Sequence, residues 1–175
     1  MERARTMTSK TLVNNKELIK NEVAYTIYSQ CMYNPTEEKY RKRMEQILQD
    51  KNGFIYFCFQ DNIMCGMISL RILENQSEIL GIAVSKDYQK RGVGSFMIRQ
   101  IIKDKSILKL YAETDDDAVE FYKKCGFDIH AKTKNYGNMN KIRYISGKIV
   151  YEGDYQIAVK NQKSDLEITT SEIKQ

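Results

Sequence analysis

Apolar residues recur along the chain with two different periods, and each period predicts a type of element. Near the start they repeat every three or four residues, which predicts helices over about 16–30 and 34–50. A short apolar stretch at 11–13 predicts a strand before them. The apolar face of the second helix would hold Tyr40, Met44, Ile47 and Leu48. Both helices therefore need another layer to pack against.

The start of the second helix is marked by Asn34-Pro35-Thr36-Glu37. Asparagine is a good N-cap, proline suits the first helical position, and the glutamate stands three residues after the asparagine. We therefore predict that Asn34 caps this helix. Asn52-Gly53 is expected to follow its end near Asp50.

Two apolar runs further along the chain predict a β-hairpin. They cover 54–59 and 63–70, and Asp61-Asn62 between them has the composition of a two-residue turn. Cys58 and Cys65 would then face each other. We expect them to be reduced, packed thiols.

A strand, a glycine turn and a helix follow, and the rest of the chain is organised around them. Ser77–Val84 contains an unbroken apolar run, which is typical of a strand buried on both faces. Ser95 is expected to open a helix that ends at Lys105, and the apolar run at 107–112 predicts the next strand. A strand, a helix and a strand of these lengths form a βαβ unit, whose two strands are expected to be parallel.

The last predicted elements complete the fold class. A helix is expected from Asp115–Asp117 to Gly126, and two strands, at 127–131 and 142–150, are expected around a loop at Asn135–Asn140. This order predicts an α+β fold: a mixed, mostly antiparallel sheet with a central parallel βαβ unit and flanking helices. We expect one domain over residues 1–150. A polar C-terminal extension would occupy 151–175, with a short strand at 155–159.

The composition is that of an ordinary globular protein. The 175 residues are 42% hydrophobic and 29% charged, and 28 basic against 23 acidic residues give a net charge of +5. The apolar runs are far shorter than the ~20 residues that cross a bilayer, and the first residues lack the apolar segment of a secretory signal. We therefore expect a cytoplasmic protein with no membrane partner. The basic residues are spread along the chain with little aromatic interleaving, so a nucleic acid is a weaker candidate partner.

The sequence does not predict a metal site. The four cysteines show no C-x-x-C spacing and His130 is the single histidine, whereas zinc needs clustered ligands. No sequence pattern ties His130 to Cys125, so an activated thiol nucleophile is not expected either.

Candidate chemistry lies in the turn after the strand at 77–84. This turn, Gln89-Lys90-Arg91-Gly92-Val93-Gly94, has two glycines one residue apart. A glycine turn at a helix N-terminus presents unpaired main-chain N–H groups and a positive dipole end, which suits a phosphate. The dinucleotide-binding fingerprint does not fit, because Met97 stands where its third glycine would be, and no G-K-[ST] sequence marks a P-loop.

Two motifs in order resemble the GNAT superfamily of acetyl-CoA-dependent N-acetyltransferases. Gln89-x-x-Gly92-x-Gly94 resembles the family's pyrophosphate loop, [QR]-x-x-G-x-[GA], after its fourth strand. The segment from Asp115 to Phe127 resembles the family's N-x-x-A-x-x-F-Y-x-x-x-G-F block, with Asp115 in place of the usual asparagine. The resemblance covers about 54–150. A carboxylate near the phosphates would repel them, so Asp115 has a second interpretation as a helix cap.

The resemblance implies which residues bind acetyl-CoA. The main chain of Ile82 and Val84 would pair with the pantetheine arm like an added strand, and N–H groups in the glycine turn would hold the pyrophosphate. Lys90 or Arg91 would add positive charge. The implied cofactor-binding set is Ile82, Ala83, Val84, Gln89, Lys90, Arg91, Gly92, Val93, Gly94, Ser95 and Asp115.

The resemblance also implies catalytic roles for two residues. Tyr122 resembles the tyrosine that donates a proton to the leaving thiolate; the alternative is a core aromatic residue, and we favour the acid role because Phe121 is expected to fill the core face. Glu78, eleven residues before Gln89, resembles a glutamate that acts as general base directly or through water. The alternative is a charged residue at a strand end. A main-chain N–H near Val84 would stabilise the oxyanion.

The function predicted from these residues is direct acetyl transfer from acetyl-CoA to a primary amine of a small molecule, peptide or protein. The first alternative is a non-catalytic acetyl-CoA sensor or interaction module with the same fold, and the second is a basic nucleic-acid-binding domain. The acceptor is expected to be set by residues 16–50, the hairpin and the 135–140 loop, which carry no decodable pattern. The sequence is compatible with a monomer and with a homodimer.

Overall fold

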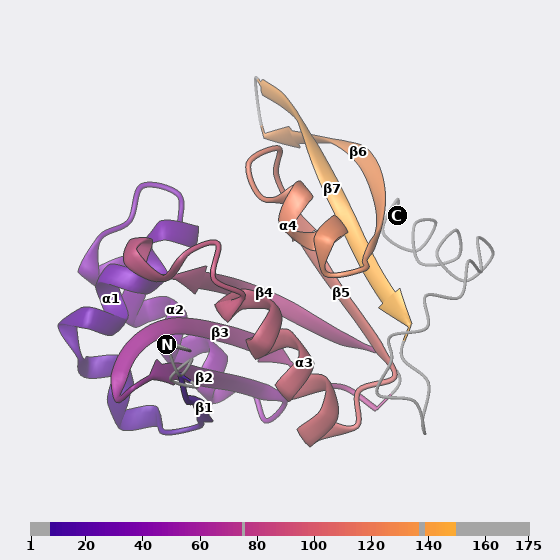
Figure 1. Cartoon of the computed structure of the whole chain (residues 1–175). Coiled ribbons are helices and arrows are strands. Elements are labelled where there is room, and N and C mark those ends of the chain that lie inside the picture. Colours follow the sequence, from indigo (N-terminus) through magenta and orange to yellow (C-terminus); the bar gives the residue numbers. More distant parts are fainter. Residues whose placement is uncertain (1–7, 75, 137–138, 150–175) are drawn as a thin grey trace. The chain divides into compact units, whose positions relative to one another are not determined.

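The computed structural model describes residues 8–74, 76–136 and 139–149 (Figure 1). They form two compact units, each with its own strands and helices. The first comprises the described parts of Met1–Leu73 and Glu78–Lys105, and the second those of Glu74–Ser77 and Ser106–Gln175. The predicted strand at 155–159 and the polar first residues 1–7 lie outside the described residues.

The strands of the first unit pair antiparallel, each with the next in sequence. They are β1 (Lys10–Val13), β2 (Gly53–Gln60), β3 (Ile63–Arg71) and β4 (Ser77–Val84). The predicted hairpin is confirmed: Asp61 and Asn62 connect β2 to β3 with φ angles of 50° and 66°. Positive φ at both central residues matches the twist of the two strands, and asparagine and aspartate tolerate it.

The helix predicted over 16–30 is interrupted. The segment forms the 3-10 helix η1 (Lys16–Lys20), α1 (Glu22–Tyr28) and the 3-10 helix η2 (Ser29–Cys31). Asn21 between the first two is extended, and its side chain accepts a hydrogen bond from the N–H of Val23 at 2.8 Å. Asn21 thus caps a new helix, because a side-chain acceptor replaces the main-chain bond that would have continued η1.

The predicted cap of the second helix is also wrong. α2 spans Glu37–Gln49, and its N-cap is Thr36, whose hydroxyl accepts from the N–H of Lys39 at 3.2 Å. Asn34 instead adopts a φ of 44° in the turn before the helix. The apolar face is as expected at Tyr40, Met44 and Ile47, which are buried, whereas Leu48 is exposed.

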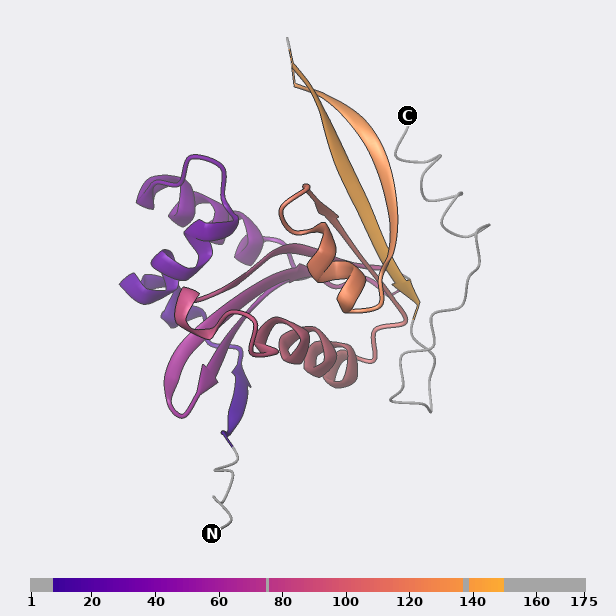
Figure 2. The ribbon, with the colours of Figure 1, turned by 45° about the horizontal axis from the view of Figure 1, so that its top comes forward.

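Both faces of the first unit's strands are covered by helices (Figure 2). Successive residues of a strand face opposite sides of the sheet, so position 66, a glycine, faces the side opposite to the side chain of Met67. Met67 belongs to the cluster with α1 and α2, and a side chain at Gly66 would meet Met97 of α3 (Val93–Lys105) at 3.0 Å. The α3 helix begins two residues before the predicted Ser95.

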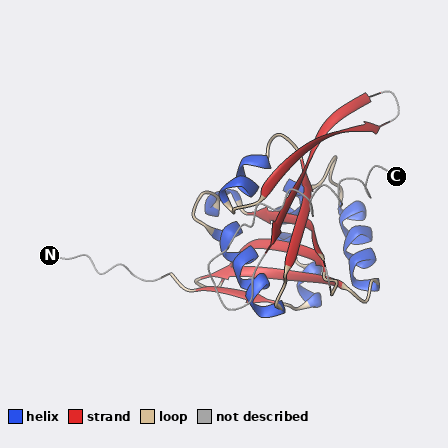
Figure 3. Cartoon of the chain, turned by 90° about the vertical axis from the view of Figure 1, so that its right-hand side faces the viewer, coloured by secondary structure: helices blue, strands red, loops and turns tan. Residues whose placement is uncertain are grey.

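The second unit consists of three strands and a short helix. Its elements are β5 (Lys109–Thr114), α4 (Val119–Lys124), β6 (Asp128–Tyr136) and β7 (Met139–Ile149). β7 pairs antiparallel with both other strands, and with β6 it forms the long ribbon in Figure 3. The loop predicted at Asn135–Asn140 is wrong in extent, because Asn135 pairs with Asn140 and Tyr136 with Met139.

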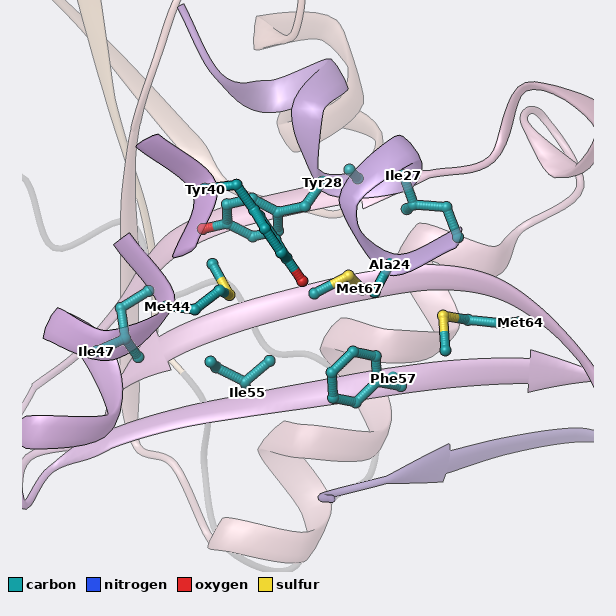
Figure 4. Packing of buried hydrophobic residues seen from close by; sticks show 11 residues of the cluster. Ala24, Ile27, Tyr28, Tyr40, Met44, Ile47, Ile55, Phe57, Met64 and Met67 are labelled. Carbon is teal, nitrogen blue, oxygen red and sulfur yellow. The ribbon is translucent and has the colours of Figure 1, made fainter. Parts of the chain in front are cut away.

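The core of the first unit lies between β2, β3 and the helices α1 and α2 (Figure 4). Phe57 and Met67 supply the strand side, and Tyr28 and Tyr40 supply the helix side with ring centroids 6.0 Å apart. Buried aromatic and sulfur-containing side chains of this size hold both helices on the strands. In the part of the chain that the structure describes, no helix is long and apolar enough to cross a membrane.

Candidate functional site

The turn after β4 has the backbone that its glycines predicted. The 3-10 helix η3 (Lys86–Tyr88) follows β4, Lys90 and Gly92 have φ angles of 59° and 78°, and the N–H of Phe96 binds the carbonyl of Gly92 at 2.9 Å. The first turn of α3 therefore begins directly after Gly92. The first N–H groups of a helix have no acceptor within it, so this turn presents main-chain donors at the positive end of the helix dipole.

Gly92 leaves open space in the turn. A Cβ atom built at this position would meet nothing within 4 Å, and its φ favours glycine over residues with a side chain. The exposed side chains of Lys90 and Arg91 precede it, with the Arg91 guanidinium 5.8 Å from the centre of the Tyr88 ring. An open main chain beside two cations fits a phosphate group.

The side chain of Gln89 fastens this turn to β4. Its Nε2 donates to the carbonyl oxygen of Val84 at 3.0 Å and to Oε1 of Gln30 at 3.1 Å. The amide is thus occupied by contacts within the first unit. The first residue of the predicted loop motif holds the turn in place, and the main-chain N–H groups are left as the donors for a ligand.

Alternate main-chain groups of β4 point away from β3. The N–H of Ser85 binds the carbonyl of Cys65 at 2.9 Å, so the groups of Ser85 and, two residues earlier, Ala83 face β3. Those of Ile82 and Val84 face the other way, as the predicted pairing with an extended ligand requires. Ala83, also in the predicted set, is buried and uses its main chain within the strand pair.

Glu78 lies in a cluster of charges at the other end of β4. Its Oε2 is 3.3 Å from Nη1 of Arg71, and Nε of Arg71 is 2.8 Å from Oδ2 of Asp50. The hydrogen bond from Arg71, with a second from the N–H of Asn52, holds the pKa of Asp50 below its ordinary value. The cluster joins the end of α2 to the strands β3 and β4.

In the second unit, Asp115 is the first residue of the second motif and Tyr122 lies within it. Oδ1 of Asp115 accepts from the N–H of Ala118 at 3.3 Å at the start of α4, which agrees with the cap interpretation. Tyr122 is buried, and its ring meets Phe121 and Phe127 edge to face at 5.1 and 5.2 Å. Phe121 is only half-buried, so the expectation that it fills the core face is wrong. The buried residues of α4 are Val119 and Tyr122.

A pocket of about 320 Å³ lies between the helical segments of the first unit and β4. Lys39, Lys42, Arg43 and Gln46 line one side, at the spacing i, i+3, i+4 and i+7 that places them on one face of α2. The other walls come from Tyr28, Cys31, Met32, Tyr33 and Leu80. The sequence interpretation missed the basic face, although its helical spacing beside the apolar face was a readable signal.

The thiol of Cys31 lies in the wall of this pocket. The residue as a whole is exposed, but its Sγ donates to the carbonyl oxygen of Tyr28 at 3.1 Å. Burial raises the pKa of this thiol to about 12, against the opposing effects of main-chain hydrogen bonds and of the Arg43 charge. Cys31 is therefore a neutral thiol at physiological pH, which makes it a poor nucleophile.

Comparisons with known proteins agree with this arrangement. The family model described as Acetyltransferase (GNAT) family matches residues 21–127. Among solved structures, the ribosomal-protein-S18-alanine N-acetyltransferase of Escherichia coli is similar to this chain, with 85% of this chain and 100% of that chain aligned, 17% identity and a TM-score of 0.63. An acetyltransferase of Salmonella typhimurium that modifies the N-terminal serine of ribosomal protein L7/L12 aligns with 83% of this chain and 97% of that chain, at 14% identity and a TM-score of 0.66.

A third similar structure was solved with acetyl-CoA bound. It is a GNAT family acetyltransferase from Elizabethkingia anophelis, with 18% identity, a TM-score of 0.59, and coverage of 81% of this chain and 98% of that chain. At these identities the structures establish the fold. The α+β fold class predicted from the sequence is confirmed.

Proposed function

The chain belongs to the GNAT acetyltransferase family, and we propose that it moves an acetyl group from acetyl-CoA directly to a primary amine. It is an acyltransferase, and acetyl-CoA is its co-substrate. Membership of the family does not specify two parts of this proposal. The first is that the amine attacks the thioester directly, and the second is which residues take part. The acceptor amine belongs to a small molecule, a peptide or a protein.

The observation that carries the proposal is the turn from Gln89 to Ser95. Positive φ at Lys90 and Gly92, open space at Gly92 and the N-terminus of α3 together support a site for the diphosphate of coenzyme A. Main-chain N–H groups from Val93 onward would bind its oxygens, and the Lys90 and Arg91 side chains would add charge.

The edge of β4 supports the site for the rest of the donor. Ile82 and Val84 turn their main-chain groups away from β3, so an extended pantetheine arm can hydrogen-bond to them. The carbonyl oxygen of Val84 already accepts a hydrogen bond from Gln89. The main-chain group of Val84 that remains for the ligand is therefore its N–H. Bound acetyl-CoA supplies a thioester that is activated toward an amine.

Acetyl transfer needs a neutral amine, donors for the oxyanion and a proton for the departing thiolate. We assign these tasks to Glu78 as base, the main-chain N–H of Val84 as oxyanion donor, and Tyr122 as acid. The Arg71 ion pair holds the Glu78 carboxylate in a fixed position. For Tyr122 the packing against Phe121 and Phe127 fixes the ring.

The direct route is supported by the state of the pocket thiol. An acyl-enzyme intermediate would require a thiolate, and burial raises the pKa of Cys31 to about 12. The amine would therefore attack the donor without a covalent enzyme intermediate.

Calorimetry with the full chain and acetyl-CoA tests the donor site, and thiol release with a panel of amines tests turnover. Heat of binding together with amine-dependent thiol release is the expected result. Binding without release for every amine would favour the acetyl-CoA sensor, and no binding would remove the transferase assignment. We further propose that residues 1–150 form the transferase domain, that the protein is cytoplasmic, and that it acts as a monomer or homodimer.

A further inference from the structure

We propose that the pocket beside α2 binds the anionic part of a small acceptor, an amine that also carries a carboxylate or phosphate group. The inference rests on the proposed transferase function and names the class of its acceptor. It is carried by the charge of the pocket wall, its contact with β4 and its size.

Three basic side chains of α2 line one wall of the pocket. Lys39, Lys42 and Arg43 share the helix face that lines the pocket. Within the described residues, no carboxylate lines this pocket and no ion pair neutralises any of the three. The neighbouring Arg41, on a different face of α2, pairs with Glu37 at 3.6 Å. The uncompensated charge is thus confined to the pocket side of the helix.

Hydrogen bonds position two of these cations and leave donors free for an anion. Nζ of Lys39 donates to the carbonyl of Asn34 at 2.9 Å, and Nη2 of Arg43 donates to the carbonyl of Leu80 at 3.4 Å. An ammonium group has three donors and a guanidinium five, so one contact each does not saturate them. A carboxylate or phosphate can accept from several such donors at once.

The pocket reaches the strand that is proposed to hold the acetyl donor. Leu80 lines it and lies two residues before Ile82, at an irregularity where the register of β3 and β4 shifts between Ser69 and Leu70. The contact from Arg43 to the Leu80 carbonyl therefore ties the cationic wall to β4. An acceptor whose anion binds α2 would have its amine next to this strand.

The charge of the pocket argues against polycationic acceptors, and its size suits a small acceptor. A polyamine or an aminoglycoside carries several positive charges, which three uncompensated cations would repel. A volume of about 320 Å³ is at the lower end of ligand pockets, ~300–1,000 Å³. The apolar parts of Tyr28, Met32 and Leu80 suit a short hydrocarbon segment between the anion and the amine.

Matched pairs of amines that differ by one anionic group test the proposal. Ethanolamine is compared with O-phosphoethanolamine, glucosamine with glucosamine 6-phosphate, and asparagine with aspartate, and spermidine serves as the cationic probe. The measured quantity is kcat/KM for thiol release, with the product mass as proof of acetylation. We expect the anionic member of at least one pair to be preferred by about tenfold or more, as charge-assisted hydrogen bonds imply. A preference in the phosphate pairs but not in the carboxylate pair, or the reverse, shows which anionic group the pocket binds.

Variants on the two faces of α2 provide the matched control. Arg43→Gln and Lys42→Gln are expected to raise KM for the anionic amine and to reduce the preference within the pair by about tenfold. Arg41→Gln removes the same charge from the other face and is expected to leave the preference unchanged. Binding of acetyl-CoA, measured by calorimetry, is expected to be the same in all three variants.

The outcomes separate this inference from the proposed function. Equal rates within every pair, a preference for spermidine, or equal effects of Arg41→Gln and Arg43→Gln would overturn the anionic acceptor and leave the transferase intact. Acetyl-CoA binding without turnover of any anionic amine would also overturn it. A chain that does not bind acetyl-CoA would overturn both.

Discussion

Nη1 of Arg71 lies 3.3 Å from Oε2 of Glu78, so the carboxylate proposed as general base is also a partner in an ion pair. The same guanidinium binds Asp50 through its Nε at 2.8 Å. Asp50 and Glu78 are therefore two carboxylates that share one cation, and only Glu78 has a proposed chemical role. This relationship supplies a control for the base.

Glu78→Gln is expected to lower kcat by about a hundredfold or more, because a general base contributes ~10²–10⁴-fold. The pH–rate profile of the variant is expected to differ from that of the wild type, because the variant has no ionisable group at this position. Asp50→Asn removes the other partner of Arg71 and is expected to keep the wild-type profile. Steady-state rates across a pH series, with one accepted amine, measure both effects.

Similar losses and similar profiles in the two variants would show that the charge cluster has a structural role alone. The proton of the amine would then leave through water.

Asp50→Asn also tests the effect of the ion pair on acid stability. The hydrogen bond from Arg71 lowers the pKa of Asp50 below its ordinary value of 3.8. A depressed pKa in the folded state stabilises the fold at pH values above 3.8, and this contribution is lost as the pH falls through the folded-state pKa. Thermal unfolding at a series of acidic pH values is expected to show a smaller fall in Tm for Asp50→Asn than for the wild type. An identical fall would mean that Asp50 is equally easy to protonate in the unfolded chain.

Local sequence predicted the strand, turn and helix around Gly92 well, because each of these features depends on neighbouring residues. The apolar run of β4, the two glycines and the amphipathic α3 specify a strand, a positive-φ turn and a helix without any distant contact. The break at Asn21 could not be predicted from periodicity, since the apolar positions continue through it while the asparagine side chain caps a new helix. Thr36 and Asn34 are both suitable caps by residue type, and only the chain path distinguishes them.

The basic pocket beside α2 could not be predicted from local sequence, for a different reason. Its basic wall belongs to one helix and has a readable spacing, but Leu80 lies far along the chain from Lys42. The fold alone brings them to one cavity. The extent of β6 and β7 was missed because strand pairing uses main-chain groups, which polar residues such as Asn135 and Asn140 also possess.

Gly92→Ala tests the turn as the diphosphate site. The added methyl group would stand in the open space of the turn at a φ of 78°, which disfavours alanine, so the affinity for acetyl-CoA is expected to fall by about tenfold or more. Lys90→Ala is the matched change, because position 90 already carries a side chain at positive φ. It removes the ammonium charge with its side chain, adds no atoms to the turn, and is expected to weaken binding less and mainly at low salt. Calorimetry measures both affinities, and an unchanged Kd for Gly92→Ala would place the diphosphate elsewhere.

Tyr122→Phe tests the proposed acid. The phenylalanine ring keeps the edge-to-face contacts with Phe121 and Phe127, so the variant is expected to fold and to bind acetyl-CoA normally. Loss of the hydroxyl is expected to lower kcat by about a hundredfold. Phe127→Leu, which disturbs the same packing without removing a hydroxyl, is the control. Wild-type turnover in Tyr122→Phe, or an equal loss in Phe127→Leu, would remove Tyr122 from the mechanism.

Gly81→Ala tests how tightly α1 is packed on β4. A Cβ atom at Gly81 would clash with the hydroxyl of Tyr28 and lie 2.8 Å from the ring carbon that bears it, while that buried hydroxyl is hydrogen-bonded to Ser69 Oγ at 2.6 Å. The substitution is expected to destabilise the chain by ~1–3 kcal/mol, the usual range for overpacking. Gly66→Ala is the control, because its tightest contact is the flexible end of Met97 at 3.0 Å, and its effect is expected to be smaller.

A double-mutant cycle with Tyr28→Phe identifies the cause of this destabilisation. Tyr28→Phe removes the hydroxyl and leaves the buried Ser69 with one bonding partner fewer, which by itself is expected to cost about 1–3 kcal/mol. In the double variant the missing hydroxyl makes room for the new methyl group, so the combined loss is expected to be smaller than the sum by ~0.5–3 kcal/mol. Chemical unfolding of the four proteins measures this coupling. Additive losses would mean that Gly81 is needed for its backbone and not for the space that Tyr28 occupies.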